Sequence, residues 1–557
     1  MSRKWWENKV VYQIYPKSFQ DTNGDGIGDL PGIISHLDYL KELGADILWI
    51  CPCFRSPFVD QGYDISDYDE IDPLFGTNDD MKKLLEEAKK RNISIILDLV
   101  VNHCSSEHRW FKKACEDPDG EYGKFFYIVD KPADGKLPTN WRSYFGGSVW
   151  SELPGNPDKL YLHVFHEKQP DLNWENPEVR KEIYAMINRW LDMGVAGFRI
   201  DAIRNIRKPE VLHDYPADQP DGSAHVTQMF TEQQDIGVYL HEMRKECFDP
   251  HDAFTVAEAS GDVASMIPDY VGEKGYFSSI FDFREIELSF RSEGWFNNEK
   301  ITPEEFKQAV FAAQKDFAPY GFPTNVLENH DGPRGANRFL PENAVDYAGK
   351  TMLSALSFFL KGVPCIYQGQ ELGMENPVFT DPSQFDDVSS AFEYNLGLER
   401  GLSPEEALKK TADLTRDNTR VPMIWDREAG DAAGFCEGKA WIGSADLVTP
   451  GARQQEKDPH SVLAFYKEMI GLRKSAEYES TFVDGELIPQ WTEVENLMAY
   501  KRCGDKQVLV AGNFNDQPVT VSMDADCKKV LLNNMEELQV DGDRLTLAAR
   551  QLVVLAI

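Results

Sequence analysis

The segments that decide the fold are TNDDMKKLLEEAKKRN (77–92) and, directly after it, ISIILDLVV (93–101). The first carries apolar residues at helical spacing behind Thr77 or Asn78, either of which can cap a helix. The second is a near-continuous apolar run, typical of a strand buried on both faces. A similar run, ADILWI (45–50), precedes the helix across a loop. Together they predict a strand, helix, strand unit.

The same unit recurs through the first two thirds of the chain. Further apolar runs are VVYQIYP (10–16), VAGFRIDAI (195–203), AFTVAEAS (253–260), FSSIFDF (277–283), FPTNVLENHD (322–331) and VPCIYQGQELG (363–373). Roughly eight buried strands joined by helices predict an α/β fold in which a parallel sheet closes into a (β/α)₈ barrel, the TIM barrel.

Three regions depart from this rhythm and define the expected domains. Residues 104–172, rich in aromatic residues, Gly and Pro, predict a loop-rich subdomain inserted after the third strand. Residues 376–427 predict a helical excursion of the barrel, which spans 1–103 and 173–481. Residues 482–557 turn to short alternating strands, which predict a separate C-terminal antiparallel β-sandwich domain.

The charge of the chain restricts its partners. Asp and Glu outnumber Lys and Arg by 93 to 58, a formal net charge of −35. This field repels nucleic acid and anionic membranes, so we expect a small uncharged ligand and neither of those partners. Nine cysteines without paired CxxC spacing, and no signal-like apolar leader, predict a cytoplasmic protein, either a monomer or a small homo-oligomer.

Chemistry-bearing side chains follow several of the predicted strands. They are Asp98, Asn102 and His103 after the third strand, Arg199 and Asp201 at the fourth, Glu258 at the fifth, and Asn329, His330 and Asp331 at the seventh. Strand ends of a barrel meet at one mouth, where neighbouring carboxylates raise each other's pKa. Arg199, two residues before Asp201 on a strand, faces the same side and can keep it ionised. Two carboxylates around one bond, one ionised and one protonated, are typical of glycoside hydrolysis.

Four sequence motifs that carry these residues resemble those of a known family. DLVVNH (98–103), GFRIDAI (197–203), TVAEAS (255–260) and ENHDGPR (328–334) resemble, in order and spacing, those of glycoside hydrolase family 13, the α-amylase family. Further similar segments are WWENKVVYQIYPKSFQDTNGDGIGD (5–29), GYDISDY (62–68), QPDLNWENP (169–177) and RDNTRVPMIWD (416–426). They narrow the resemblance to the oligo-1,6-glucosidase, dextran glucosidase and α-glucosidase branch.

The resemblance implies a retaining, exo-acting α-glucosidase that releases glucose from the non-reducing end of short α-1,6- or α-1,4-linked glucosides by double displacement. It implies Asp201 as nucleophile, Glu258 as general acid and then base, and Asp331 as a ligand of the sugar hydroxyls. The other implied sugar-binding residues are Tyr63, Asp64, His103, Phe145, Phe165, Arg199, His330 and Arg416. Catalysis of this kind uses no cofactor.

Some positions depart from the family pattern. Ala202 follows the nucleophile, where α-1,6-preferring relatives usually carry Val, and Gly332 replaces a usual Gln. The linkage and the leaving group therefore stay open. Alternatives within the family are a trehalose-6-phosphate hydrolase and a hydrolase or isomerase that acts on sucrose or isomaltulose. A non-catalytic binding homologue would be expected to lack the carboxylates that this chain has.

The loop DTNGDGIGD (21–29) admits two interpretations. Its glycines are spaced GxGxG rather than GxGxxG and stand among aspartates, which argues against a phosphate cradle. The oxygen ligands expected for a calcium loop at positions 1, 3, 5, 7 and 9 are Asp21, Asn23, Asp25, the carbonyl of Ile27, and Asp29. Position 12 is Gly32 instead of Glu, so this is not an EF-hand. Relatives that resemble this loop bind calcium there, and we expect a structural Ca²⁺.

Overall fold

The computed structural model describes residues 3–233, 235–259, 261, 263–289, 294–443 and 448–557. Its central sheet has eight parallel strands: β1 (Val11–Ile14), β2 (Ile47–Ile50), β5 (Ser94–Leu99), β10 (Gly197–Ile200), β12 (Phe254–Ala257), β13 (Ser279–Ile280), β14 (Thr324–Val326) and β15 (Val363–Tyr367). β1 pairs with β2 and β15, and a parallel bridge between Phe281 and Thr324 joins the remaining edges. The sheet is closed, and the predicted barrel is confirmed.

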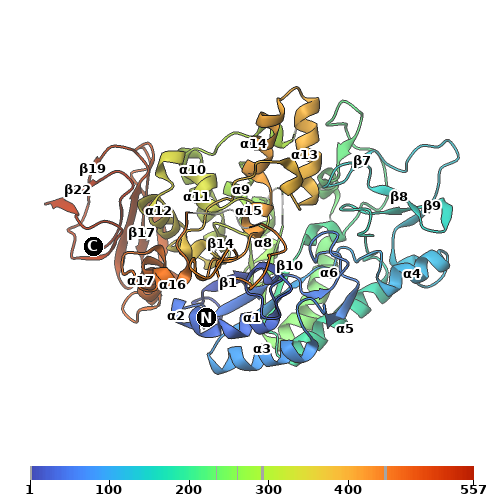
Figure 1. Ribbon diagram of the computed structural model, residues 1–557, viewed down its shortest axis with the longest axis horizontal. Coiled ribbons are helices and arrows are strands. Elements are labelled where there is room, and N and C mark those ends of the chain that lie inside the picture. The colour runs from blue at the N-terminus through green and yellow to red at the C-terminus, as the bar shows by residue number, and fades with distance from the viewer. Residues whose placement is uncertain (1–2, 234, 260, 262, 290–293, 444–447) are drawn as a thin grey trace.

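Helices surround this barrel (Figure 1). The barrel helices are α1 (Leu30–Ser35), α2 (Leu37–Leu43), α3 (Asn78–Lys90), α5 (Pro177–Met193), α6 (Ile236–Met243), α7 (Asp249–His251), α8 (Val263–Tyr270), α9 (Arg284–Glu287), α10 (Pro303–Phe317), α11 (Gly335–Phe339), α12 (Tyr347–Phe358), α16 (Ala452–Gln455), α17 (Val462–Lys474) and α18 (Glu479–Val483). Of the two predicted caps, Thr77 caps α3, and it forms a capping box with Asp80. Among the described helices, none combines the length and apolarity needed to cross a membrane.

The insert after β5 holds helix α4 (Arg109–Glu116) and the strands β6 (Ile128–Asp130), β7 (Trp141–Arg142), β8 (Trp150–Leu153) and β9 (Asn156–Leu162). It is completed by chain from beyond β10, because β11 (Ala224–His225) pairs in parallel with β7. Val226 and Met229 also join Trp141 and Trp150 in a small core of their own. The 104–172 segment therefore shares its core with a loop that the sequence analysis assigns to the barrel.

The excursion contains α13 (Val388–Glu399), α14 (Pro404–Leu414) and α15 (Asp417–Arg420). A short antiparallel pair, β3 (Phe54–Arg55) and β4 (Asp67–Ile71), lies in the loop after β2. In Figure 1 the insert and the C-terminal domain occupy opposite ends of the molecule, with α13 and α14 rising between them. The barrel mouth is thus bordered by the insert and the excursion.

The C-terminal domain contains two antiparallel sheets. One is ordered β16 (Glu486–Gln490), β17 (Leu497–Cys503), β18 (Gln507–Asn513), β23 (Leu552–Ala556), β20 (Lys529–Asn533), and the other β19 (Val519–Ser522), β22 (Arg544–Leu547), β21 (Gln539–Asp541). Leu509 and Leu545, one from each sheet, share an apolar core, whereas Tyr500 and Val510 belong to the core of the barrel. The larger sheet therefore packs on the smaller sheet with one face and on the barrel with the other, which agrees with the predicted C-terminal β domain.

Candidate active site

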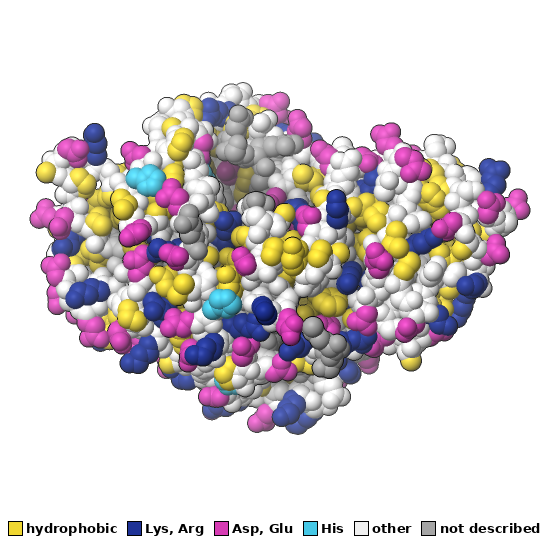
Figure 2. Space-filling view, turned by 180° about the vertical axis from the view of Figure 1, so that it is seen from behind, with side chains coloured by type: hydrophobic (Ala, Val, Ile, Leu, Met, Phe, Trp, Pro, Cys, Tyr) yellow, Lys and Arg dark blue, Asp and Glu magenta, His cyan; other side chains and the backbone are white. Residues whose placement is uncertain are grey.

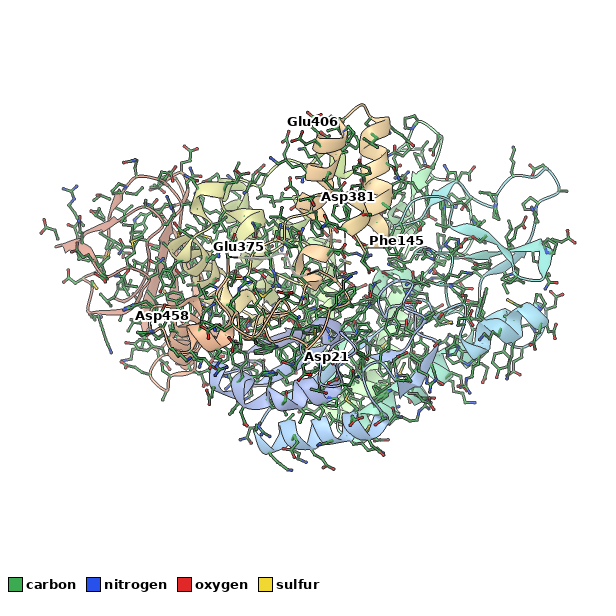
Figure 3. All side chains as sticks on the ribbon, in the orientation of Figure 1. Asp21, Phe145, Glu375, Asp381, Glu406 and Asp458 are labelled. Atoms are coloured by element: carbon green, nitrogen blue, oxygen red, sulfur yellow. The ribbon has the colours of Figure 1, made fainter. Side chains whose placement is uncertain are left out.

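A pocket of about 500 Å³ opens at the carboxyl ends of the barrel strands. Eight of the predicted site residues line it: Tyr63, His103, Phe145, Phe165, Asp201, Glu258, Asp331 and Arg416. They come from loops after β2, β5, β10, β12 and β14, from the insert and from the excursion. Figure 3 labels Phe145 where the insert meets the excursion helices. The fold thus brings together side chains that are far apart in sequence.

The buried Arg199 holds three carboxylates together at the base of this pocket. Its Nη1 donates to Asp201 Oδ1 at 2.6 Å and to Asp98 Oδ1 at 2.7 Å, and its Nη2 lies 2.7 Å from Glu258 Oε2. The backbone N–H of Ala202 also donates to Glu258 at 3.0 Å. Because the two carboxylates share one guanidinium, they lie close together on either side of its fork.

The carboxyl groups beside Arg199 all have raised pKa values. Burial raises the pKa of Asp201 to about 7 and that of Glu258 to about 7, although Arg199 opposes both shifts. Burial likewise raises the pKa of Asp98 to about 6. At neutral pH the three groups therefore retain a proton among them, and their titrations are coupled. An arrangement that holds one carboxyl protonated beside one ionised carboxylate suits acid catalysis with a nucleophile.

For Asp331, the effect of nearby groups outweighs that of burial and keeps the carboxyl group ionised. Burial would raise its pKa, but His330 and the arginines Arg420 and Arg416 lower the pKa to about 2. Arg420 Nη2 donates to Asp331 Oδ1 at 3.1 Å. Burial lowers the pKa of His330 to about 3, so its ring is neutral at pH 7 and the arginines supply the positive charge. His330 lies beneath the pocket, 3.0 Å from Asp331 through Nε2.

Arg416 and Asp60 form the wall at the end of the pocket. Arg416 Nη2 lies 2.6 Å from Asp387 Oδ1 and 3.3 Å from Asp60 Oδ1, and its guanidinium faces the Phe145 ring at 5.5 Å. Arg416 and Asp387 belong to the excursion, whereas Asp60 belongs to the loop after β2. Ion pairs between these two segments close the pocket on this side.

The role expected for Asp64 needs correction. Its side chain is fully buried outside the pocket lining, and its carboxylate accepts from Ser56 Oγ at 3.0 Å, from Val59 N at 2.9 Å and from Asp60 N at 3.0 Å. It braces the loop that presents Asp60, which the sequence analysis did not select. Both lie in the segment PFVDQGYDISDY (57–68), where spacing alone does not tell which aspartate faces the pocket.

The remaining predicted ligands surround the same cavity. The Tyr63 hydroxyl contacts His330 and donates to Asp98 at 3.2 Å. His103 Nε2 lies 3.0 Å from the carbonyl of Tyr63, and its ring packs on Phe165 at 5.0 Å. These contacts fix the orientation of the rings, so packing as well as charge determines the shape of the cavity.

The loop 21–29 lies apart from the pocket. Asp21 Oδ1 accepts from Gly24 N at 2.8 Å, Asn23 Oδ1 from Asp25 N at 2.9 Å, Asp25 Oδ1 from Ile27 N at 2.9 Å, and Asp29 Oδ1 from Gly32 N at 2.7 Å. Among the described residues, no three His, Cys, Asp or Glu side chains are grouped to hold a metal ion. Asn23 Oδ1 and Asp25 Oδ1 each keep a second lone pair that a cation could use. Asp21 Oδ1 also accepts from Asn23 N at 2.9 Å, and Asp29 Oδ1 also accepts from Thr22 Oγ1 at 3.0 Å.

A closed (β/α)₈ barrel whose mouth holds a proton-sharing pair of carboxylates and a third, ionised one defines a glycoside hydrolase. The family model of the alpha amylase catalytic domain matches residues 13–481, and the chain belongs to this family.

Two relatives and one solved structure extend this comparison. The chain is 40% identical to probable oligo-1,6-glucosidase 3 of Bacillus subtilis, over 93% of this chain and 92% of the other. It is 38% identical to the trehalose-6-phosphate hydrolase of the same organism, over 96% and 94%. The structure of the trehalulose synthase from Pseudomonas mesoacidophila is similar over 100% of both chains, with a TM-score of 0.92 and 33% identity.

Proposed function

We propose that this protein is a retaining, exo-acting α-glucosidase that releases glucose from the non-reducing end of short, uncharged α-glucosides. The observation that carries the proposal is the single guanidinium of Arg199 between Asp201 and Glu258, at 2.6 and 2.7 Å. Carboxyl groups held by one guanidinium lie close together. Retaining enzymes have such a short separation, about 5 Å, which leaves no room for a water between the carboxylate and the sugar.

The reaction then proceeds in two displacements. Asp201 attacks C1 of the terminal glucose while Glu258 donates its proton to the glycosidic oxygen, so the C1–O bond breaks and the shortened sugar leaves. A water next gives its proton to Glu258 and attacks C1, which breaks the bond to Asp201 and frees glucose. Asp331, ionised through Arg420 and Arg416, accepts hydrogen bonds from sugar hydroxyls in both steps.

Exo action is supported by the wall behind the cleavage point. Asp60, Arg416 and Phe145 close that end of the pocket through the contacts between two loops. A terminal glucose fits against such a wall, whereas an internal segment of a chain requires an opening on both sides.

The deciding experiment is glucose release from isomaltose, panose, maltose, trehalose, sucrose and trehalose 6-phosphate. We expect glucose from at least one of the uncharged α-glucosides, and losses of about a thousandfold or more in kcat for Asp201→Asn and Glu258→Gln. Trehalulose or isomaltulose as the main product from sucrose would assign isomerisation instead. No cleavage by the wild type, or full activity in both variants, would overturn the proposal.

The proposal also covers a bound cation, the cellular location and the oligomeric state. We propose a structural Ca²⁺ at the loop 21–29, for which the ligand spacing is the support. We propose a cytoplasmic location because all nine cysteines are unpaired thiols, a state that a reducing compartment maintains. We propose a monomer or small homo-oligomer, to be measured by light scattering.

A further inference from the structure

Gln13 of β1 is a buried polar residue next to the site to which the proposed reaction gives no role. Its side chain is fully buried inside the barrel and is not part of the pocket lining. Gln13 Nε2 lies 2.8 Å from Nδ1 of His330 and donates to Cys51 Sγ at 3.2 Å. The amide therefore bonds to a ring that itself borders the carboxylate of Asp331.

The ring of His330 has a single proton to place. Burial lowers the pKa of His330 to about 3, so the ring is neutral at pH 7 and carries one N–H, on Nδ1 or on Nε2. Nε2 lies 3.0 Å from Asp331 Oδ2. Asp331 is ionised at this pH, and its oxygens can only accept. The N–H is therefore on Nε2, and Nδ1 is left as an acceptor.

The hydroxyl of Tyr63 agrees with this assignment. It contacts His330 Nε2, and it donates to Asp98 Oδ2 at 3.2 Å. A hydroxyl has one proton, so an oxygen that donates to Asp98 is left to accept from Nε2–H. The contacts then form one directed chain, in which Gln13 donates to His330, His330 to Asp331 and Tyr63, and Tyr63 to Asp98.

The orientation of the Gln13 amide follows from the same chain, because the two ends of an amide are told apart by their partners. With its N–H toward Nδ1, Gln13 Oε1 has no hydrogen-bond partner among the described residues. The reverse orientation would let Oε1 accept from the thiol of Cys51, which burial keeps protonated by raising its pKa. It would also place the ring proton on Nδ1 and turn a lone pair of Nε2 toward Asp331. An unpaired buried oxygen is costly, so this arrangement indicates a functional constraint.

Packing holds the ring itself in place. The rings of Tyr63 and His330 are stacked 5.4 Å apart, and Trp49 meets the His330 ring edge-on at 5.9 Å. Arg420 Nε donates to the carbonyl of His330 at 3.0 Å. On the face shown in Figure 2, acidic and basic side chains are interspersed among the described residues, without a broad area of one charge. The groups in direct contact therefore decide which nitrogen carries the proton.

We propose that Gln13 is a positioning residue, whose amide N–H bonds to Nδ1 of His330 and keeps the ring proton on Nε2, where it is donated to Asp331. This proposal rests on the proposed function, in which Asp331 accepts hydrogen bonds from the sugar hydroxyls. With His330 on Oδ2 and Arg420 on Oδ1, the carboxylate keeps one orientation toward the sugar. The bond made by one imidazole nitrogen sets the state of the other, so Gln13 acts on the sugar site without touching it.

The test is nitrogen NMR of the full chain labelled at its 11 histidines, with His330→Asn to assign the signals of His330. We expect the wild type to carry the proton on Nε2 at pH 7. Gln13→Met fills a similar volume without a donor, so it should shift the Nδ1 signal. It should also lower kcat/KM by about tenfold to a hundredfold, the loss found when a hydrogen bond that orients a functional histidine is removed.

The matched control is Gln370→Met. Gln370 is also buried, and its Nε2 donates to Tyr466 Oη at 2.9 Å while its Oε1 accepts from Tyr367 N at 3.1 Å, away from the pocket lining. This variant should lower Tm but leave the His330 signals and kcat/KM unchanged. Thermal unfolding shows whether each variant folds. The wild-type measurement needs no substitution, so it tests the proposal even where Gln13→Met does not fold.

Three outcomes would overturn the proposal. They are a proton on Nδ1 of His330 in the wild type, wild-type kcat/KM in a folded Gln13→Met, and an equal loss of kcat/KM in Gln370→Met. Failure of the proposed function is distinct, because the wild type would then release no glucose while the nitrogen signals still placed the proton on Nε2.

Discussion

Arg199 shows how one buried residue can set several charge states. It contacts Asp98, Asp201 and Glu258, and Trp49 and Tyr63 each donate a hydrogen bond to Asp98 on the other side. A buried guanidinium with fewer carboxylates would ionise them all, whereas three buried carboxylates exceed the charge of one arginine. Burial of the three carboxyl groups is the main physical reason why a proton stays in the site at neutral pH, and repulsion between them adds to it.

The pH profile of kcat/KM follows from this retained proton. Burial raises the pKa of Glu258 to about 7, so its acid form persists to a higher pH than that of an ordinary glutamate. We expect kcat/KM to fall as pH rises through about 7, when this proton is lost. We also expect it to fall on the acid side as Asp201, whose pKa burial likewise raises to about 7, takes up a proton, so the profile is a narrow bell near pH 7. Asp331, with its pKa near 2, stays ionised throughout.

A change of leaving group provides the control for this profile. Hydrolysis of α-glucosyl fluoride needs no proton on the departing atom, so its alkaline decline should be much weaker than that of a disaccharide measured in the same buffers. Equal alkaline declines for both substrates would show that the proton of Glu258 is not the one that is lost.

Asp60 and Asp64 make a matched pair for a second prediction. Asp60→Asn replaces the carboxylate that faces Arg416 in the pocket wall with a neutral amide. We expect KM to rise about tenfold with little change in thermal stability. Asp64→Asn disturbs three buried hydrogen bonds outside the pocket, and we expect a lower Tm with a smaller effect on KM. Steady-state kinetics and calorimetry check both variants, and the reverse pattern would restore Asp64 as the sugar ligand.

At the residue scale, strand ends were more predictable than loops. Asp201, Glu258 and Asp331 could be placed in one mouth because parallel strands of a barrel end together. The pairing of Arg416 with Asp387 and Asp60 could not be placed, since it depends on how an excursion folds back over the loop after β2. Such contacts are set by tertiary packing between segments hundreds of residues apart, and no local pattern encodes them.

At the scale of elements, the loop 21–29 joins β1 to α1, and its proposed Ca²⁺ leads to a third prediction. Removal of the ion by a chelator should lower Tm, and added Ca²⁺ should restore it, because a ligand bound at a hundredfold its Kd stabilises the folded state by about 2.7 kcal/mol. Asp25→Ala removes a proposed ligand and should abolish this response. An identical Tm with chelator and with Ca²⁺ would mean that the loop is held by its own hydrogen bonds.

The insert illustrates why element boundaries are harder to predict than element types. Its aromatic, Gly- and Pro-rich composition marks the 104–172 segment, but the strand β11 that completes it is two residues long and lies in a loop of mixed polarity. The pairing of β11 with β7 and the burial of Val226 and Met229 against Trp141 reveal the connection. Because β10 ends next to Asp201, this shared core also fixes the loop that follows that carboxylate.

At the scale of the whole molecule, the C-terminal domain is fastened to the barrel rather than tethered to it. Tyr500 Oη donates to the carbonyl of Leu356 at 2.8 Å, and Arg502 Nη1 donates to that of Phe359 at 2.7 Å. Both carbonyls lie at the C-terminal end of α12, where helix carbonyls lack partners within the helix. The sheet therefore satisfies polar groups of the barrel as well as covering its apolar surface.

This interface gives the last prediction. A Cβ on Gly512 of β18 would lie 2.8 Å from Leu356 Cδ1 and 2.8 Å from Met352 Cγ, so Gly512→Ala must displace buried side chains of α12. We expect a loss of about 1–3 kcal/mol of stability, seen as a lower Tm, with an unchanged KM because the pocket opens elsewhere. Gly471→Ala in α17 is the matched control, since no atom lies within 4 Å of its added Cβ. It should raise stability by about 0.5–1 kcal/mol. Equal melting temperatures for the two variants would mean that the sheet and α12 are not tightly packed in solution.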